Sequence, residues 1–105
     1  MSGSGSVGWT PSTPKNRCDQ LSFLSTISSP QPAVIVQLSL GDELRVKLQV
    51  APQTAVVVEY KGSVAGALTG TQLSSLINCL QNGYDFVAKV TAIGGGKCTV
   101  EVRSL

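Results

Sequence analysis

The feature that most constrains this chain is the order of patterns in residues 62–105, where a strand, a helix and a hairpin follow one another with short connections. The apolar stretch 64–68 predicts a strand, and Gly66 within it indicates a bulge or the close approach of another backbone segment. Alternating apolar residues in 84–93 and 97–103 predict a hairpin that turns at three consecutive glycines. This order is typical of a small β-rich domain with one helix.

The helix is the clearest of these elements. Four apolar residues recur at helical spacing and form one stripe: Leu73, Leu76, Ile77 and Leu80. Either Thr69 or Thr71 is placed to cap the first turn, and Gly83 is placed to end the helix. The rest of the helix surface carries Ser, Gln and Asn without charge, which suits either solvent or contact with another protein.

Further strands are predicted upstream of the helix. Residues 33–40 and 44–50 read as two strands around a turn at 41–42, and the second alternates cleanly between apolar and polar residues. A third strand is predicted at 54–60, where consecutive valines indicate a strand covered on both faces. Residues 18–32 read as a short strand or an arm that ends at prolines.

Composition separates a tail from a domain. Residues 1–16 are almost wholly Gly, Ser, Thr and Pro, which predicts a disordered tail. Trp9 is its exception, either a docking anchor or a residue that rests on its own domain. Residues 17–105 are predicted to form a single domain of the mainly β (α+β) class, a small antiparallel β-barrel of five or six strands with one α-helix. Its core is expected to be aliphatic, because 42% of the chain is hydrophobic and only 5% is aromatic.

Several kinds of chemistry are excluded by composition. The chain has no histidine, which rules out triads and metal sites that depend on imidazole. The acidic residues are scattered singly, so no catalytic carboxylate pair is predicted. No helix follows Gly94–Gly96, so this stretch is not a phosphate-binding loop. We therefore expect a protein that is not an enzyme and that uses no metal and no cofactor.

The cysteines and the hydropathy pattern indicate the cellular compartment that we expect for this protein. Cys18, Cys79 and Cys98 are odd in number and widely spaced, which indicates reduced thiols rather than a disulfide scaffold. Lys15 and Arg17 would lower the pKa of the Cys18 thiol, so Cys18 is the one candidate reactive thiol; the alternative is a small apolar side chain that packs the arm. No membrane span or signal peptide is visible. We expect a cytoplasmic protein without a membrane partner.

The basic residues give the strongest functional signal. Five of them point away from the predicted core on strands: Arg45, Lys47, Lys89, Lys97 and Arg103. Such a face can follow the backbone of single-stranded nucleic acid, with Tyr60 or Tyr84 available to stack on a base. Glu59 and Glu101 interrupt this surface, and strand exteriors often carry lysine for solubility. Nucleic-acid binding is therefore the alternative hypothesis.

The favoured hypothesis is a non-enzymatic binding module, an adaptor that acts through another protein or through a second copy of itself. The neutral exterior of the helix suits a protein contact. The stretch AVIVQL at 33–38 would be prone to aggregation if it lay at the edge of a sheet. Pairing that edge with a partner strand would remove this hazard and predicts an oligomer.

From Val56 onward, the order of strand, Gly62, the strand Val64-Ala65-Gly66-Ala67-Leu68, helix, Gly83 and closing hairpin resembles the C-terminal half of HIRAN domains. These are small β-barrels found on DNA-remodelling helicases and as stand-alone bacterial and phage proteins. The family strand reads G-x-x-V/I-G-Y-L, and this chain keeps its second Gly and its Leu with Ala67 in place of the aromatic residue. The resemblance implies a bacterial protein with a barrel fold. The family segment N-x-Y-D-x-x-A-I, which supplies much of a single-stranded DNA-end pocket, is not found at 51–58.

Overall fold

The computed structural model describes residues 18–51 and 53–105. The predicted tail at 1–16 lies outside the described residues, and so do Trp9, Lys15 and Arg17. The predictions made for them stay predictions.

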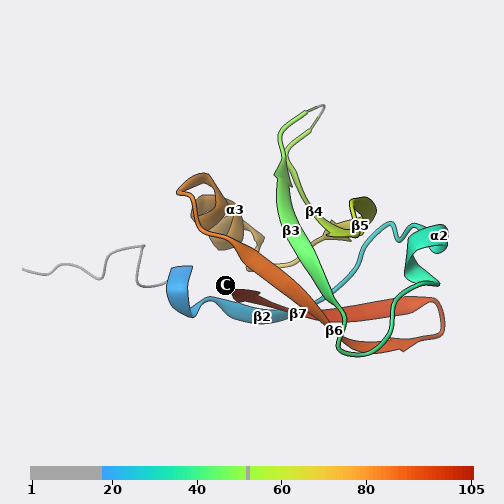
Figure 1. Ribbon diagram of the computed structural model, residues 1–105. Helices are drawn as coiled ribbons and strands as arrows, with labels where there is room; N and C mark the ends of the chain where they lie inside the picture. The colour runs from blue at the N-terminus through green and yellow to red at the C-terminus, as the bar shows by residue number, and fades with distance from the viewer. Residues whose placement is uncertain (1–17, 52) are drawn as a thin grey trace, which may run out of the picture.

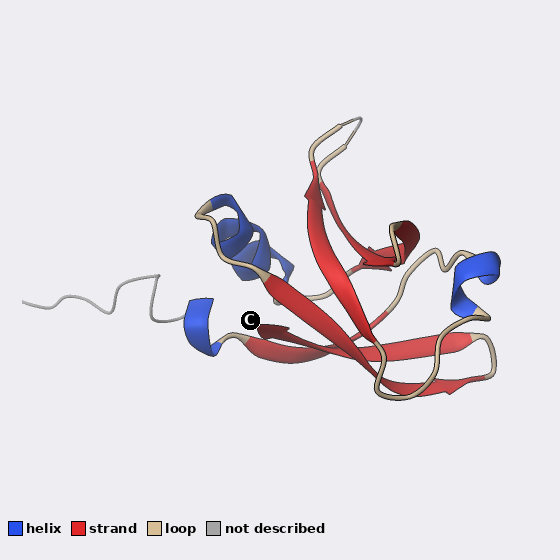
Figure 2. Ribbon diagram, in the orientation of Figure 1, coloured by secondary structure: helices blue, strands red, loops and turns tan. Residues whose placement is uncertain are grey.

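The described chain forms one antiparallel sheet that curls into a half-barrel, in the strand order β2-β7-β6-β3-β4-β5 (Figures 1 and 2). Its strands are β2 (Ser22–Thr26), β3 (Glu43–Gln49), β4 (Ala55–Tyr60), β5 (Ser63–Leu68), β6 (Phe86–Gly94) and β7 (Lys97–Ser104). The main helix is α3 (Leu73–Gln81), and the short α2 (Pro32–Ile35) and a helical turn at 18–20 accompany it. The predicted antiparallel β fold of five or six strands is confirmed, and the short helical segments are additions to it.

Two tight hairpin turns connect neighbouring strands of the sheet, β4 to β5 and β6 to β7. In the β4–β5 turn, Lys61 and Gly62 both have positive φ, at 52° and 85°, and in the β6–β7 turn Gly95 and Gly96 have φ of 58° and 79°. Positive φ at both central residues defines the type I′ turn, whose twist matches that of the flanking strands. The β6–β7 turn lies at the three glycines where the sequence predicted it, and the β4–β5 turn falls between the predicted strands at 54–60 and 64–68.

The concave face of the half-barrel holds an aliphatic core. Its best buried side chains are Leu44, Val56, Val58, Leu68, Leu76, Phe86, Val90, Val100 and Val102. In β4 the three consecutive valines are all buried, as predicted for a strand covered on both faces. In β6 the register shifts between Val90 and Ala92, so Ala92 is exposed although the alternation predicted it to face the core.

The predicted strand at 33–40 is wrong. This segment begins with α2, where Pro32 occupies the first turn, a position at which its fixed φ fits and its missing N–H costs nothing. Val34 and Leu38 are both buried, whereas Val36 between them is 79% exposed; in a strand all three side chains would lie on one face. The chain then reaches β6, where the Gly41 N–H donates to the Val90 carbonyl at 2.8 Å. The stretch AVIVQL therefore presents no strand at the edge of the sheet.

The two edges of the sheet meet at Gly66, where the sequence predicted a bulge or the close approach of another backbone segment. Ser28 and Ala67 exchange backbone hydrogen bonds of 2.7 and 2.9 Å, which join the chain after β2 to β5. A Cβ at residue 66 would overlap the Ile27 side chain and would lie 2.8 Å from the Ser28 carbonyl oxygen. Only glycine leaves room for this approach, which draws the sheet toward closure.

Helix α3 ends as predicted but begins differently. Its cap residue is Gln72, which makes no side-chain hydrogen bond, so neither Thr69 nor Thr71 caps the helix. The Leu73 N–H instead donates to the Gly70 carbonyl at 3.3 Å, so a backbone turn replaces the side-chain cap. At the other end Gly83 has a φ of 90°, the conformation that terminates many helices.

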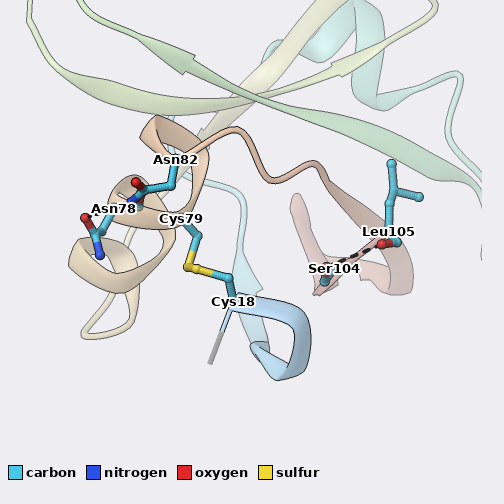
Figure 3. The surroundings of a disulfide bond; sticks show 6 residues. All are labelled: Cys18, Asn78, Cys79, Asn82, Ser104 and Leu105. Atoms are coloured by element: carbon cyan, nitrogen blue, oxygen red, sulfur yellow. Dashed lines mark hydrogen bonds between the residues drawn. A yellow bond between two sulfur atoms is a disulfide. The ribbon is translucent and has the colours of Figure 1, made fainter. Parts of the chain in front are cut away.

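A disulfide joins Cys18 to Cys79 and ties the helical turn at 18–20 to α3 (Figure 3). The Cα atoms are 5.5 Å apart, across 61 residues of sequence. The prediction of reduced thiols is therefore wrong for this pair, and Cys18 is not a reactive thiol, because the fold brings it against the buried side of α3. Cys98 is free and buried, and burial raises the pKa of its thiol.

Among the described residues, no helix combines the length and the apolar character that crossing a membrane requires.

Candidate functional site

Strand alternation directs a set of charged side chains to the convex outer face of the sheet. We call this set the charged face: Glu43, Arg45 and Lys47 of β3, Glu59 of β4, Lys89 of β6, and Glu101 and Arg103 of β7. Their chain neighbours, such as Leu44, Val46 and Val102, are buried in the core. The same alternation that builds the core therefore fixes the positions of the charges.

The strand register places acids opposite bases. Glu43 pairs with Lys89 across β3 and β6, and Lys89 pairs with Glu101 across β6 and β7. In the register of β3 with β4, Arg45 lies directly opposite Glu59. Directly opposed side chains on antiparallel strands have Cβ atoms about 5 Å apart. Arg45 and Lys89, at the centre of the face, therefore each have a carboxylate on a neighbouring strand.

Two ion pairs link more distant members of the face. Lys47 Nζ lies 3.3 Å from Glu59 Oε1, and Arg103 Nη2 lies 3.9 Å from Glu43 Oε2. The second pair reaches from β7 to β3 across the intervening β6. The side chains of Lys47 and Arg103 are about half exposed, at 53% and 49%, so each pair contributes at most about 1 kcal/mol. The pairs orient the side chains more than they stabilise the fold.

A shallow depression of about 340 Å³ runs along β3, β4 and the turn after β4. It is lined by Glu43, Arg45, Lys47, Glu59, Lys61 and Gly62. Among the residues that the structure describes, Arg45 makes no ion pair. The Lys61 ammonium lies 5.2 Å from the centroid of the Tyr60 ring. Groups of both charges line the depression, so it does not select an anion.

The structure brings together most but not all of the predicted basic site. Arg45, Lys47, Lys89 and Arg103 share the charged face. Lys97 stands apart at the β6–β7 turn, opposite Gly94. Tyr60 and Tyr84 are half-buried and pack against the core, so neither offers an aromatic platform on the charged face.

Glu43 is the member that sequence reasoning missed. The outward direction of Glu43 is predictable, because the alternation that begins at Leu44 places residue 43 on the opposite face. Its neighbours are not predictable from the sequence, because they depend on the pairing of β3 with β6, which sets Glu43 opposite Lys89 and within reach of Arg103.

The described side chains of this face form ion pairs. In residues 18–51 and 53–105, no group of Cys, Asp and Glu is arranged to hold a metal ion. The one free thiol in those ranges, Cys98, is buried and is directed to the core rather than to this surface.

Comparison with known proteins adds no relative: no family model matches the chain, and no curated protein and no solved structure matches it. The resemblance to HIRAN domains therefore stays a prediction.

Proposed function

We propose that this chain is a non-enzymatic binding module that recognises another protein through the charged face. One observation carries the proposal, the alternation of acids and bases that the strand register imposes. A protein surface offers both signs of charge and can match such a pattern. Complementary charge across an interface contributes orientation and specificity more than affinity.

The same alternation disfavours the alternative, single-stranded nucleic acid. A phosphate backbone is uniformly negative and would meet Glu43, Glu59 and Glu101 together with the bases. The two tyrosines that would stack on nucleotide bases pack against the core instead. A protein partner is therefore favoured.

The proposal is tested by carbodiimide cross-linking, which joins a carboxylate to an amine at an ion pair. The full chain is cross-linked in native extract, and captured proteins are accepted only when a cross-linked peptide contains Lys89, Glu43 or Glu101. Lys89→Glu reverses the central charge and should abolish those cross-links. Lys97→Glu makes the same change in net charge outside the face and should leave them in place.

A second variant separates loss of recognition from loss of fold. Glu43→Lys combined with Lys89→Glu restores the local charge balance but reverses the pattern, and it should also lose the partner. Equal capture by this double variant and by wild type would contradict the proposal. Retention of a labelled oligonucleotide that weakens with salt and with Arg45→Ala would instead support nucleic-acid binding.

A further inference from the structure

The end of α3 carries the one Asn-Gly pair in the chain, Asn82 followed by Gly83. Asparagine before glycine is the pair most prone to deamidation, because the glycine has no side chain to obstruct attack by its backbone nitrogen on the asparagine side chain. The other asparagines, Asn16 and Asn78, both precede residues that carry a side chain. Asn82 and Gly83 are exposed, so solvent water has access to both.

The closed end of α3 holds Asn82 in a conformation that cannot react. Its side-chain Nδ2 donates to the Asn78 carbonyl oxygen at 2.8 Å, one turn back along the helix (Figure 3). The ψ of Asn82 is 10°, which turns the Gly83 nitrogen away from the side-chain carbon Cγ. Deamidation joins these two atoms in a five-membered ring, so the last turn of α3 must open first.

Few bonds keep this turn closed. The Gly83 N–H donates to the Leu80 carbonyl at 3.1 Å. The Tyr84 N–H donates to the Cys79 carbonyl at 3.1 Å, and the two bonds together form the Schellman motif that ends many helices. Opening the turn breaks these bonds and the side-chain bond of Asn82 but leaves the sheet intact. Local opening of this kind is far more frequent than unfolding of the whole domain.

We propose that Asn82 is a site of spontaneous deamidation, which reacts when the last turn of α3 opens. The Gly83 nitrogen forms a bond to Cγ of Asn82 and loses its proton, and the side-chain nitrogen takes up a proton and leaves as ammonia. The product is a cyclic succinimide. One water molecule then opens the ring at either of its carbonyls, which leaves aspartate or isoaspartate at position 82.

The new carboxylate would weaken the end of the helix. It cannot donate to the Asn78 carbonyl, so the 2.8 Å bond is lost. It also places a negative charge beside the free carbonyls of the helix C-terminus, where the helix dipole disfavours it. The last turn has no basic residue to compensate, and α3 itself carries no charge. This site lies on α3 rather than on the charged face, so it does not depend on the proposed function.

Peptide mass spectrometry of the purified full chain tests the site. Samples are aged in mildly alkaline buffer, native and in concentrated urea, and isoaspartate is detected by enzymatic methylation. The amide of Asn82 should be lost about a hundredfold faster in urea than in native buffer, because only a few hydrogen bonds hold the turn closed. Asn78 should stay an amide in the same samples. Asn82→Gln should stay an amide at position 82, since its longer side chain does not form the five-membered ring.

The consequence is measured on Asn82→Asp, which carries the product from the start. Its midpoint of thermal unfolding should lie about 5 °C below that of wild type. Three results would overturn the inference. The first is a rate at Asn82 that is the same in native buffer and in urea, or no loss of its amide in either. The second is a native rate below about a thousandth of the rate in urea, since the site would then open only with the whole domain. The third is an Asn82→Asp variant as stable as wild type.

Discussion

The disulfide between Cys18 and Cys79 should contribute a large share of the stability of this domain. It closes a loop across 61 residues of sequence. The loop-closure estimate for such a length is about 4 kcal/mol of unfolding free energy. Domains of this size are stable by only about 5–15 kcal/mol. Within α3, Leu76 and Cys79 are buried and Leu73, Ile77 and Leu80 pack against the core, so the disulfide adds its restriction of the unfolded chain to a helix that is already packed on the domain.

Thermal unfolding with and without a thiol reductant measures this contribution on a single protein. At about 4–8 °C per kcal/mol for a small domain, reduction should lower the midpoint by about 15 °C or more. Cys18→Ala combined with Cys79→Ala should unfold at the lower midpoint in both conditions. Cys98→Ala keeps the disulfide and should retain the sensitivity to reductant, even though loss of its buried thiol lowers the starting stability.

Two results would refute this reasoning. An unchanged midpoint on reduction would mean that the cross-link does not restrict the unfolded chain. Intact-mass measurement after alkylation in denaturant without reductant should find one modified cysteine, Cys98. Three modified cysteines would mean that the disulfide does not form.

Substitutions at single sites test three other contributions to stability. Gly66→Ala should lower the free energy of unfolding by about 2 kcal/mol or more, because its Cβ would lie 2.8 Å from a backbone oxygen. Gly94→Ala is the control: its Cβ would have nothing within 4 Å, and the free energy of unfolding should change by less than about 0.5 kcal/mol. Urea titrations measure both changes. Burial raises the pKa of the Cys98 thiol above its usual 9.0, so the folded state holds this proton more tightly than the unfolded state. The stability that this proton contributes is fully present below pH 9.0 and is lost as pH rises through the raised pKa of the Cys98 thiol. The free energy of unfolding of wild type and of Cys98→Ala should therefore differ by an amount that changes between about pH 7 and 11, and a constant difference would contradict this. A double-mutant cycle of Lys47→Ala and Glu59→Ala should give a coupling below about 1 kcal/mol that decreases further in high salt.

The parts of the fold that are predictable from sequence are those where local periodicity and burial agree. The alternation at 44–50 and 97–103 survives in β3 and β7, because each strand has one face on the core and one toward solvent. The apolar face of α3 is predictable from the helical spacing of its residues, and the turn between β6 and β7 is predictable from its three glycines. The outward direction of Arg45 and Lys89 follows from the same alternation, because each lies between two apolar residues of its strand.

The features that are not predictable depend on contacts distant in sequence. The stretch at 33–38 is apolar enough for a strand or a helix. It begins with helix α2 because Pro32 suits the first turn of a helix and because Val34 and Leu38 are both buried in the core. The pairing of Cys18 with Cys79 requires α3 to lie beside the start of β2, which no spacing of cysteines reveals. The partner of Glu43 likewise depends on which strands are neighbours.

The proposed recognition through the charged face depends on the positions that the strands give to its charges. Type I′ turns at Lys61–Gly62 and Gly95–Gly96 connect β4 to β5 and β6 to β7, the register shifts once within each of these pairs, and adjacent strands lie about 4.8 Å apart. The charges of both signs therefore lie on hydrogen-bonded strands rather than on loops. A partner whose own charges match this arrangement in one orientation would meet like charges in most others. Under the proposed function, a nearly balanced face of this kind would discriminate among partners by the order of its charges, which net charge alone does not reveal.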